Sequence, residues 1–131
     1  MSAAPGPAPS SSARARGLGS AKRGTGAWRA ERVTAIALVP LTLWLVASLV
    51  ALGRADRTAF DAWLGKPLDG FLTILLLIAA FRHTALGLQV VIEDYVHSAA
   101  KTPLLIVNHL LCFAICAAGV LATLSVMFTR A

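Results

Sequence analysis

The sequence predicts an all-α membrane protein with three transmembrane helices, preceded by a disordered basic N-terminal tail. Composition is the first indication: of 131 residues, 57% are hydrophobic and only 14% are charged, which is more apolar surface than one small soluble core can bury. The second is that the apolar residues fall into three runs. Each run reaches the roughly 20 residues that a helix needs to cross a hydrocarbon core of about 30 Å.

The chain begins with a segment rich in Ala, Ser, Gly, Pro and Arg that shows no apolar periodicity. Such a segment cannot offset the entropy of folding, so residues 1–27 are expected to form a disordered basic tail. The composition fits a bacterial cytoplasmic tail and also resembles an organellar transit peptide. The membrane anchor domain then covers residues 28–131.

The three apolar runs predict helices near residues 33–52, 68–93 and 103–128. Because a backbone in lipid must satisfy its own hydrogen bonds, a helix is the natural form for a span of this length. Pro40 is expected to bend the first helix mildly. The segment 53–67 and the short stretch DYVHSAAKT are predicted to be loops.

Basic residues predict the orientation. The net charge is +6, and half of the Lys and Arg residues precede the first apolar run, where Glu31 is the only acid. This bias indicates a bacterial inner membrane protein with a cytoplasmic amino terminus and, after three crossings, a periplasmic carboxyl terminus. A mitochondrial inner membrane is the alternative. Since the charge sits in a tail on a hydrophobic body, the expected partner is the lipid bilayer and not a nucleic acid.

Two cysteines, Cys112 and Cys116, lie four residues apart inside the last apolar run. There is no CxxC motif and no second pair, so neither a zinc site nor a structural disulfide is predicted. We expect both to be small packing residues.

His83 is the most informative polar residue of the middle run. Counted back from Asp94, taken as the cytoplasmic helix end, it lies eleven residues deep, or roughly 16 Å at the helical rise. An ionisable residue at that depth is a functional candidate by default. At about 100° per residue, His83, Gly87, Val90 and Asp94 form one stripe. An imidazole beside the bare backbone of Gly87 suits a haem, with His83 as an axial iron ligand.

Spacing alone leaves alternatives open. His83 could instead hydrogen-bond a neighbouring helix. A second axial ligand could come from His109 or from a partner chain, and the partner is favoured because His109 should lie nearer the surface. Asp94 and Tyr95 could bind a quinone carbonyl and deliver protons, or simply form a helix end and an aromatic belt residue. Arg82 could pair with a haem propionate or with an acid on another subunit, or snorkel.

The motif H-x3-G-x7-Y from His83 to Tyr95, with Asp94 before the tyrosine, occurs together with the stretch RVTAIAL that begins at Arg32. These features resemble the hydrophobic membrane anchor subunit of succinate dehydrogenase, the smaller cytochrome b anchor chain of respiratory complex II. The similarity covers nearly everything after the tail. It implies a subunit of a respiratory-chain and tricarboxylic acid cycle enzyme that oxidises succinate on its other subunits.

The resemblance also implies site residues. His83 matches one axial ligand of a haem b shared with the other anchor subunit, which supplies the second ligand. Tyr95 and Asp94 match the site for ubiquinone, the substrate, and Arg32 matches a residue close to the haem propionates. The implied partners are a flavoprotein subunit with FAD, an iron-sulfur subunit with its clusters and a cytochrome b556-type anchor subunit. This chain has no GxGxxG motif and no cysteine cluster, which is consistent with that division.

Two other functions stay open on the sequence. The first is the related anchor of a fumarate reductase, which runs the chemistry in reverse with a low-potential quinone. The second is a small transport or structural membrane protein in which Arg82 and His83 line an aqueous path or pin a helix interface. The lack of an internal repeat and the odd number of spans argue against the second.

Overall fold

A computed structural model describes residues 21–130 of the chain, and this part consists of helices joined by short connections. The helices are α2 (Ala21–Leu52), α3 (Arg57–Leu64), α4 (Pro67–Tyr95) and α5 (Lys101–Arg130). In the described part, α2, α4 and α5 are long and apolar enough to cross a membrane. The predicted all-α fold with three spans is confirmed. Most of the predicted tail lies outside the described residues.

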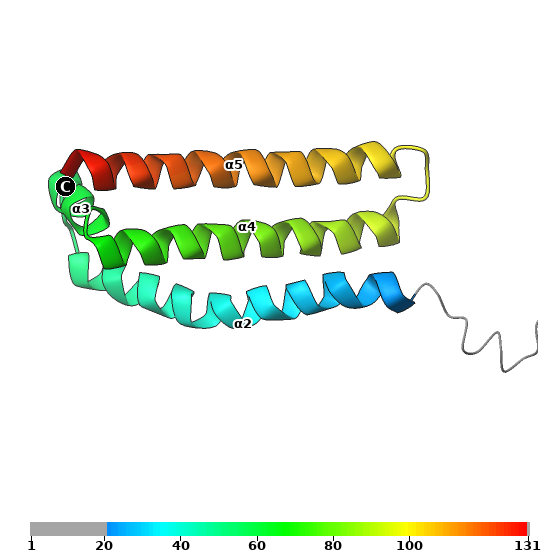
Figure 1. The fold of residues 1–131 in the computed structure, drawn as a ribbon, viewed down its shortest axis with the longest axis horizontal. Coiled ribbons are helices and arrows are strands. Elements are labelled where there is room, and N and C mark those ends of the chain that lie inside the picture. The colour runs from blue at the N-terminus through cyan, green and yellow to red at the C-terminus, as the bar shows by residue number, and fades with distance from the viewer. Residues whose placement is uncertain (1–20, 131) are drawn as a thin grey trace, which may run out of the picture.

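The middle helix α4 lies between α2 and α5 and packs against both (Figure 1). Gly119 marks a close approach between α5 and α4, because a Cβ at that position would come within 3.2 Å of Leu77 Cδ1. Near the other end of the same contact, the buried Asn108 donates a hydrogen bond of 2.9 Å from Nδ2 to the carbonyl oxygen of Ala85. Small residues and interhelical hydrogen bonds are the usual means of holding helices together in lipid.

Large apolar side chains remain exposed along all three long helices. Ile36 on α2 is 72% exposed and Phe113 on α5 is 73% exposed, whereas few large side chains are buried. An exposed apolar surface of this extent suits lipid tails or other transmembrane helices. The chain therefore has little core of its own.

Helix α2 begins at Ala21, well before the start predicted near residue 33. The upstream residues are mostly Ala, Lys and Arg, which favour a helix once a membrane span fixes the following turns. Pro40 lies inside the helix, which curves instead of breaking (Figure 1). Gly53 ends α2 with a φ of 59°, and its N–H contacts the carbonyls of Leu49 and Val50 at 3.1 Å, as glycine caps do.

The segment predicted as the first loop contains a helix, α3, so that prediction is wrong in part. The Asp56 side chain caps its first turn by accepting a hydrogen bond of 2.8 Å from the N–H of Ala59. Trp63 and Leu64 are buried, and the ring of Trp63 stacks on Trp44 of α2 with 5.8 Å between centroids. The spacing of Phe60, Trp63 and Leu64 is the sequence signal for this amphipathic helix.

The two ends of the bundle differ. The start of α2 and the connection between α4 and α5 lie together at one end, and α3 lies at the other end with the finish of α5 (Figure 1). We call the first of these the loop end, defined by the start of α2 and residues 93–101. There Lys101 Nζ donates a hydrogen bond of 3.0 Å to the carbonyl oxygen of Glu93, a favourable placement of positive charge at a helix carboxyl terminus.

Gly70 fills a position where α4 meets α3 and α5 too closely for a side chain. A Cβ there would overlap Met127 Sδ and lie 2.9 Å from the carbonyl oxygen of Leu64. The methionine can move, but the backbone oxygen cannot do so cheaply. We expect Gly70→Ala to destabilise the subunit by about 1 to 3 kcal/mol through overpacking, measured as a lower temperature of thermal unfolding of the purified complex.

Gly26→Ala is the matched control, because a Cβ at Gly26 would meet nothing within 4 Å. Alanine is also the better helix former, so this variant should be at least as stable as the parent. Equal melting temperatures for the Gly70 and Gly26 variants would show that the close approach at Gly70 is absent.

Candidate functional site

His83 lies in the middle of α4, and its half-buried imidazole faces α2. The ring Nδ1 is 3.1 Å from Thr34 Oγ1 on α2. The same hydroxyl oxygen is 2.9 Å from the carbonyl oxygens of Ala30 and Glu31. Within the described part of the chain, His83 Nε2 makes no hydrogen bond. An imidazole nitrogen that makes no hydrogen bond and carries no proton can bind a metal ion through its lone pair.

Gly87 follows His83 by one turn of α4. A Cβ added at Gly87 would meet nothing within 4 Å, so there is open space beside the helix next to the imidazole. A flat porphyrin needs such space beside its ligand, and these two residues therefore fit a haem. Residues 21–130 contain no cluster of three or more metal-ligating side chains.

Arg82 belongs to a different surface from His83. Together with His109, Cys112 and Cys116 it lines a groove of about 250 Å³ between α4 and α5. His109 Nδ1 donates a hydrogen bond of 2.9 Å to the carbonyl oxygen of Leu105, one turn earlier. His83 does not line this groove. The structure thus does not bring His83 and His109 together, and it gives Arg82 no ion pair among the described residues.

The two cysteines are free thiols, and Cys112 is buried. Its Sγ lies 3.7 Å from Asn108 Oδ1, beside the hydrogen bond from Asn108 to α4. Cys112 therefore packs at the contact of α4 with α5, whereas Cys116 is half-buried and lines the groove beside it.

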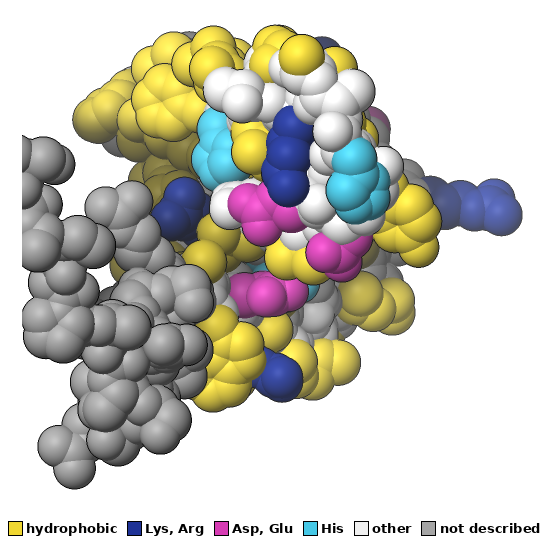
Figure 2. Space-filling view, turned by 90° about the vertical axis from the view of Figure 1, so that its right-hand side faces the viewer, with side chains coloured by type: hydrophobic (Ala, Val, Ile, Leu, Met, Phe, Trp, Pro, Cys, Tyr) yellow, Lys and Arg dark blue, Asp and Glu magenta, His cyan; other side chains and the backbone are white. Residues whose placement is uncertain are grey.

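Asp94 and Tyr95 close α4 at the loop end, and both side chains are exposed, Tyr95 by 82%. Figure 2 looks onto this end, where acidic and histidine side chains gather around the end of the α4 and α5 pair. Neither residue lines the groove of Arg82. A ligand held by Tyr95 and Asp94 would therefore need walls supplied by another subunit.

Arg32 lies on α2 near the loop end, with its guanidinium over the ring of Trp28 at 5.5 Å from the centroid. It is exposed, and it precedes Thr34 by two residues, which places the two side chains on opposite sides of the helix. The structure therefore puts Thr34, and not Arg32, against His83. Sequence reasoning did not find Thr34, because a threonine that bonds back to its own helix is ordinary in membrane spans.

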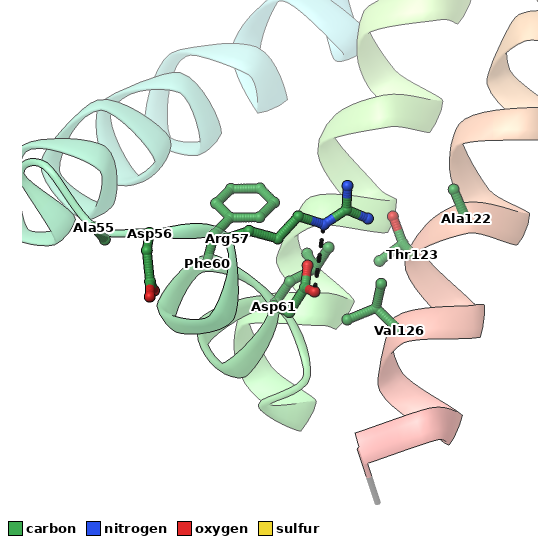
Figure 3. Close-up of a pocket in the computed structure, with 9 residues that line it drawn as sticks. Ala55, Asp56, Arg57, Phe60, Asp61, Ala122, Thr123 and Val126 are labelled. Atoms are coloured by element: carbon green, nitrogen blue, oxygen red, sulfur yellow. Dashed lines mark ion pairs between the residues drawn. The ribbon is translucent and has the colours of Figure 1, made fainter.

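A larger cavity of about 520 Å³ lies at the opposite end of the bundle, between α3 and α5. Figure 3 shows its lining, in which Arg57 faces Asp61 with 3.6 Å between Nε and Oδ2. The side chain of Arg57 is 89% exposed, so the pair is a surface salt bridge of at most about 1 kcal/mol. None of the site residues predicted from the sequence lines this cavity.

This three-span chain is similar to a known family of membrane proteins. The family model of succinate dehydrogenase/fumarate reductase transmembrane subunits matches residues 8–123. The chain belongs to this family. It is a multi-pass membrane protein and a membrane anchor subunit of succinate dehydrogenase, as expected from the sequence. The alternative of a small transport protein is thereby set aside.

Individual relatives agree with the family. The chain is 37% identical to the succinate dehydrogenase hydrophobic membrane anchor subunit of Rickettsia bellii (strain RML369-C), over 63% of this chain and 66% of the relative. It is 32% identical to the subunit of the same name in Rickettsia conorii, over 83% and 88% of the two chains. Identity to the Paracoccus denitrificans subunit is also 32%, over 82% of this chain and 84% of the relative. No solved structure matches the anchor subunit significantly.

Proposed function

We propose that this anchor subunit supplies one axial ligand of a haem b shared with a second anchor subunit and forms part of the site at which ubiquinone is reduced. The observation that supports this proposal best is the environment of the His83 imidazole. The imidazole lies in the middle of a span, is hydrogen-bonded through Nδ1 alone within the described residues, and has open space beside it at Gly87. An ionisable group at that depth needs a partner that compensates for its burial.

His83 would hold the haem iron through Nε2, the ring nitrogen that α2 leaves free. Gly87 would let the porphyrin approach α4, because it presents no side chain. When bound, the haem supplies a one-electron redox centre. Arg32 is the proposed partner of the propionates, and for this role its guanidinium would have to leave the ring of Trp28. The second axial ligand would come from the partner anchor subunit.

Tyr95 and Asp94 are the proposed quinone-site residues. Reduction of ubiquinone to ubiquinol consumes two electrons and two protons. The electrons would arrive from succinate through the flavoprotein and iron-sulfur subunits. The phenol of Tyr95 can donate a hydrogen bond to a quinone carbonyl, and the carboxylate of Asp94 can pass protons from water to the site. Both side chains are exposed, which leaves them accessible to a quinone and to the subunits that would close the pocket.

The proposed orientation places the loop end on the cytoplasmic side. The basic residues that precede the first apolar run support this assignment, since Lys and Arg near a span are retained on that side. Protons for ubiquinol would then be taken up from the same compartment that delivers the electrons. We therefore expect the reaction to move no net charge across the bilayer.

A reduced-minus-oxidised optical spectrum of the complex, purified with its natural partner subunits, tests the haem assignment. We expect the absorption bands of a b-type haem and an extractable porphyrin in proportion to the anchor subunit. A colourless complex would contradict the proposal. Turnover measured in both directions, with ubiquinone and menaquinone analogues, distinguishes succinate oxidation from the fumarate reductase alternative, for which fumarate reduction with the low-potential quinone would be faster.

A further inference from the structure

The hydroxyl of Thr34 contacts three polar atoms at once. Its Oγ1 lies 2.9 Å from the carbonyl oxygen of Ala30, 2.9 Å from that of Glu31 and 3.1 Å from His83 Nδ1. A hydroxyl has one proton and two lone pairs, and a carbonyl oxygen can only accept. If the proton pointed at His83, the lone pairs of Oγ1 would face two carbonyl oxygens at 2.9 Å with no hydrogen between them. That arrangement is repulsive, so the proton lies toward the carbonyls.

We infer that Thr34 accepts a hydrogen bond from His83 and thereby fixes the imidazole tautomer that can bind iron through Nε2. With its proton directed to the helix carbonyls, Oγ1 offers a lone pair to Nδ1, and Nδ1 must carry the hydrogen. The lone pair of the neutral ring is then on Nε2, the nitrogen with no hydrogen bond in the described part of the chain. Thr34 is a positioning residue, because it would act on the haem only through His83. The inference rests on the proposed haem ligation.

This contact has two consequences for the ligand. The hydrogen bond joins α2 to α4 across 49 residues of sequence, so it holds the ring plane as well as the tautomer. An acceptor on Nδ1 also raises the basicity of the ligating nitrogen. A more basic ligand stabilises ferric iron relative to ferrous iron and lowers the reduction potential. Loss of the acceptor should therefore raise the potential of the haem.

Thr34→Val tests this prediction in the purified complex, because valine keeps the shape of threonine and removes the oxygen. We expect the ratio of reduced to oxidised haem, at the midpoint potential of the wild type, to rise by about threefold to tenfold. For a one-electron couple this corresponds to a shift of about 28 to 59 mV toward higher potential. Thr34→Ser restores a hydroxyl, and we expect it to return the potential toward that of the wild type. The readouts are a potentiometric titration of the haem bands and the haem content.

Thr42→Val is the matched control on the same helix. The hydroxyl of Thr42 also bonds back to its own helix, to the carbonyls of Leu38 at 2.6 Å and Val39 at 3.1 Å. It is exposed and contacts no histidine among the described residues. The same substitution there should leave the haem content and the potential unchanged.

Each possible result either supports or overturns the proposed role of Thr34. A raised potential in Thr34→Val, or loss of haem from it that Thr34→Ser restores, supports the inference. An unchanged or lowered potential with full haem content overturns it while leaving the haem proposal intact. Loss of haem from both Thr34 variants also overturns it, since the hydroxyl would then not be what matters. A wild-type complex without haem overturns the proposed function itself, and with it this role of Thr34.

Discussion

Replacing His83 by alanine is expected to produce the largest change in the haem of the complex. The substitution removes one of two proposed axial ligands from the middle of α4, a helix that contains no other histidine. We expect the haem content to fall at least about tenfold, the scale on which even weaker perturbations of a ligand act, or the remaining haem to change from a six-coordinate to a five-coordinate spectrum. Optical and electron paramagnetic resonance spectra of the purified complex measure both outcomes.

His109→Ala is the control for this experiment. His109 is also half-buried within a span, but it lines the groove between α4 and α5, away from the contact of His83 with α2. We expect this variant to keep its haem and an unaltered spectrum. If His109→Ala lost the haem while His83→Ala retained it unchanged, the ligand would have been assigned to the wrong helix.

Removing the phenol hydroxyl of Tyr95 should selectively impair quinone reduction. Tyr95→Phe keeps the ring, and because the side chain is 82% exposed the fold of the anchor should not change. Hydrogen bonding and proton delivery by a positioned side chain typically contribute a factor of about 10² to 10⁴. We expect electron transfer from succinate to ubiquinone to fall at least about tenfold, measured as kcat and kcat/KM for a ubiquinone analogue.

Two comparisons make this result specific. Succinate oxidation by an artificial acceptor should remain near the wild-type rate, because that activity belongs to the other subunits. Trp28→Phe alters another exposed aromatic ring at the loop end and should leave ubiquinone reduction intact. If the Tyr95 variant reduced quinone normally, Tyr95 would have no role in quinone binding and would be only an aromatic belt residue of the membrane interface.

The three spans could be predicted from the sequence because lipid imposes a length and a hydropathy on every helix that crosses it. The boundaries were less predictable. Ala21 starts α2 early because helix-forming residues continue a turn that the membrane has already nucleated. The short helix α3 depends on the stacking of Trp63 on Trp44, a tertiary contact. Its local signals, the Asp56 cap and the spacing of Phe60, Trp63 and Leu64, are visible in hindsight.

The candidate site was predictable only in part, for a related reason. The depth of His83 and the bare backbone of Gly87 follow from counting along one helix. The surface that each polar residue faces depends on how the helices are packed. Counting could not place Thr34 against His83, since 49 residues separate them, and it could not show that Arg82 and His109 share a groove with the cysteines.

The arrangement of α4 between α2 and α5, with most large apolar side chains facing outward, has a consequence in the cell. A single layer of three helices buries too few side chains to form a core. Its folding stability must therefore depend on binding to the partner subunits. Copies synthesised in excess of the partner subunits would stay incompletely folded and would be degraded by membrane proteases. The steady-state amount of this chain should therefore follow the scarcest member of the assembly and not the rate of its own synthesis.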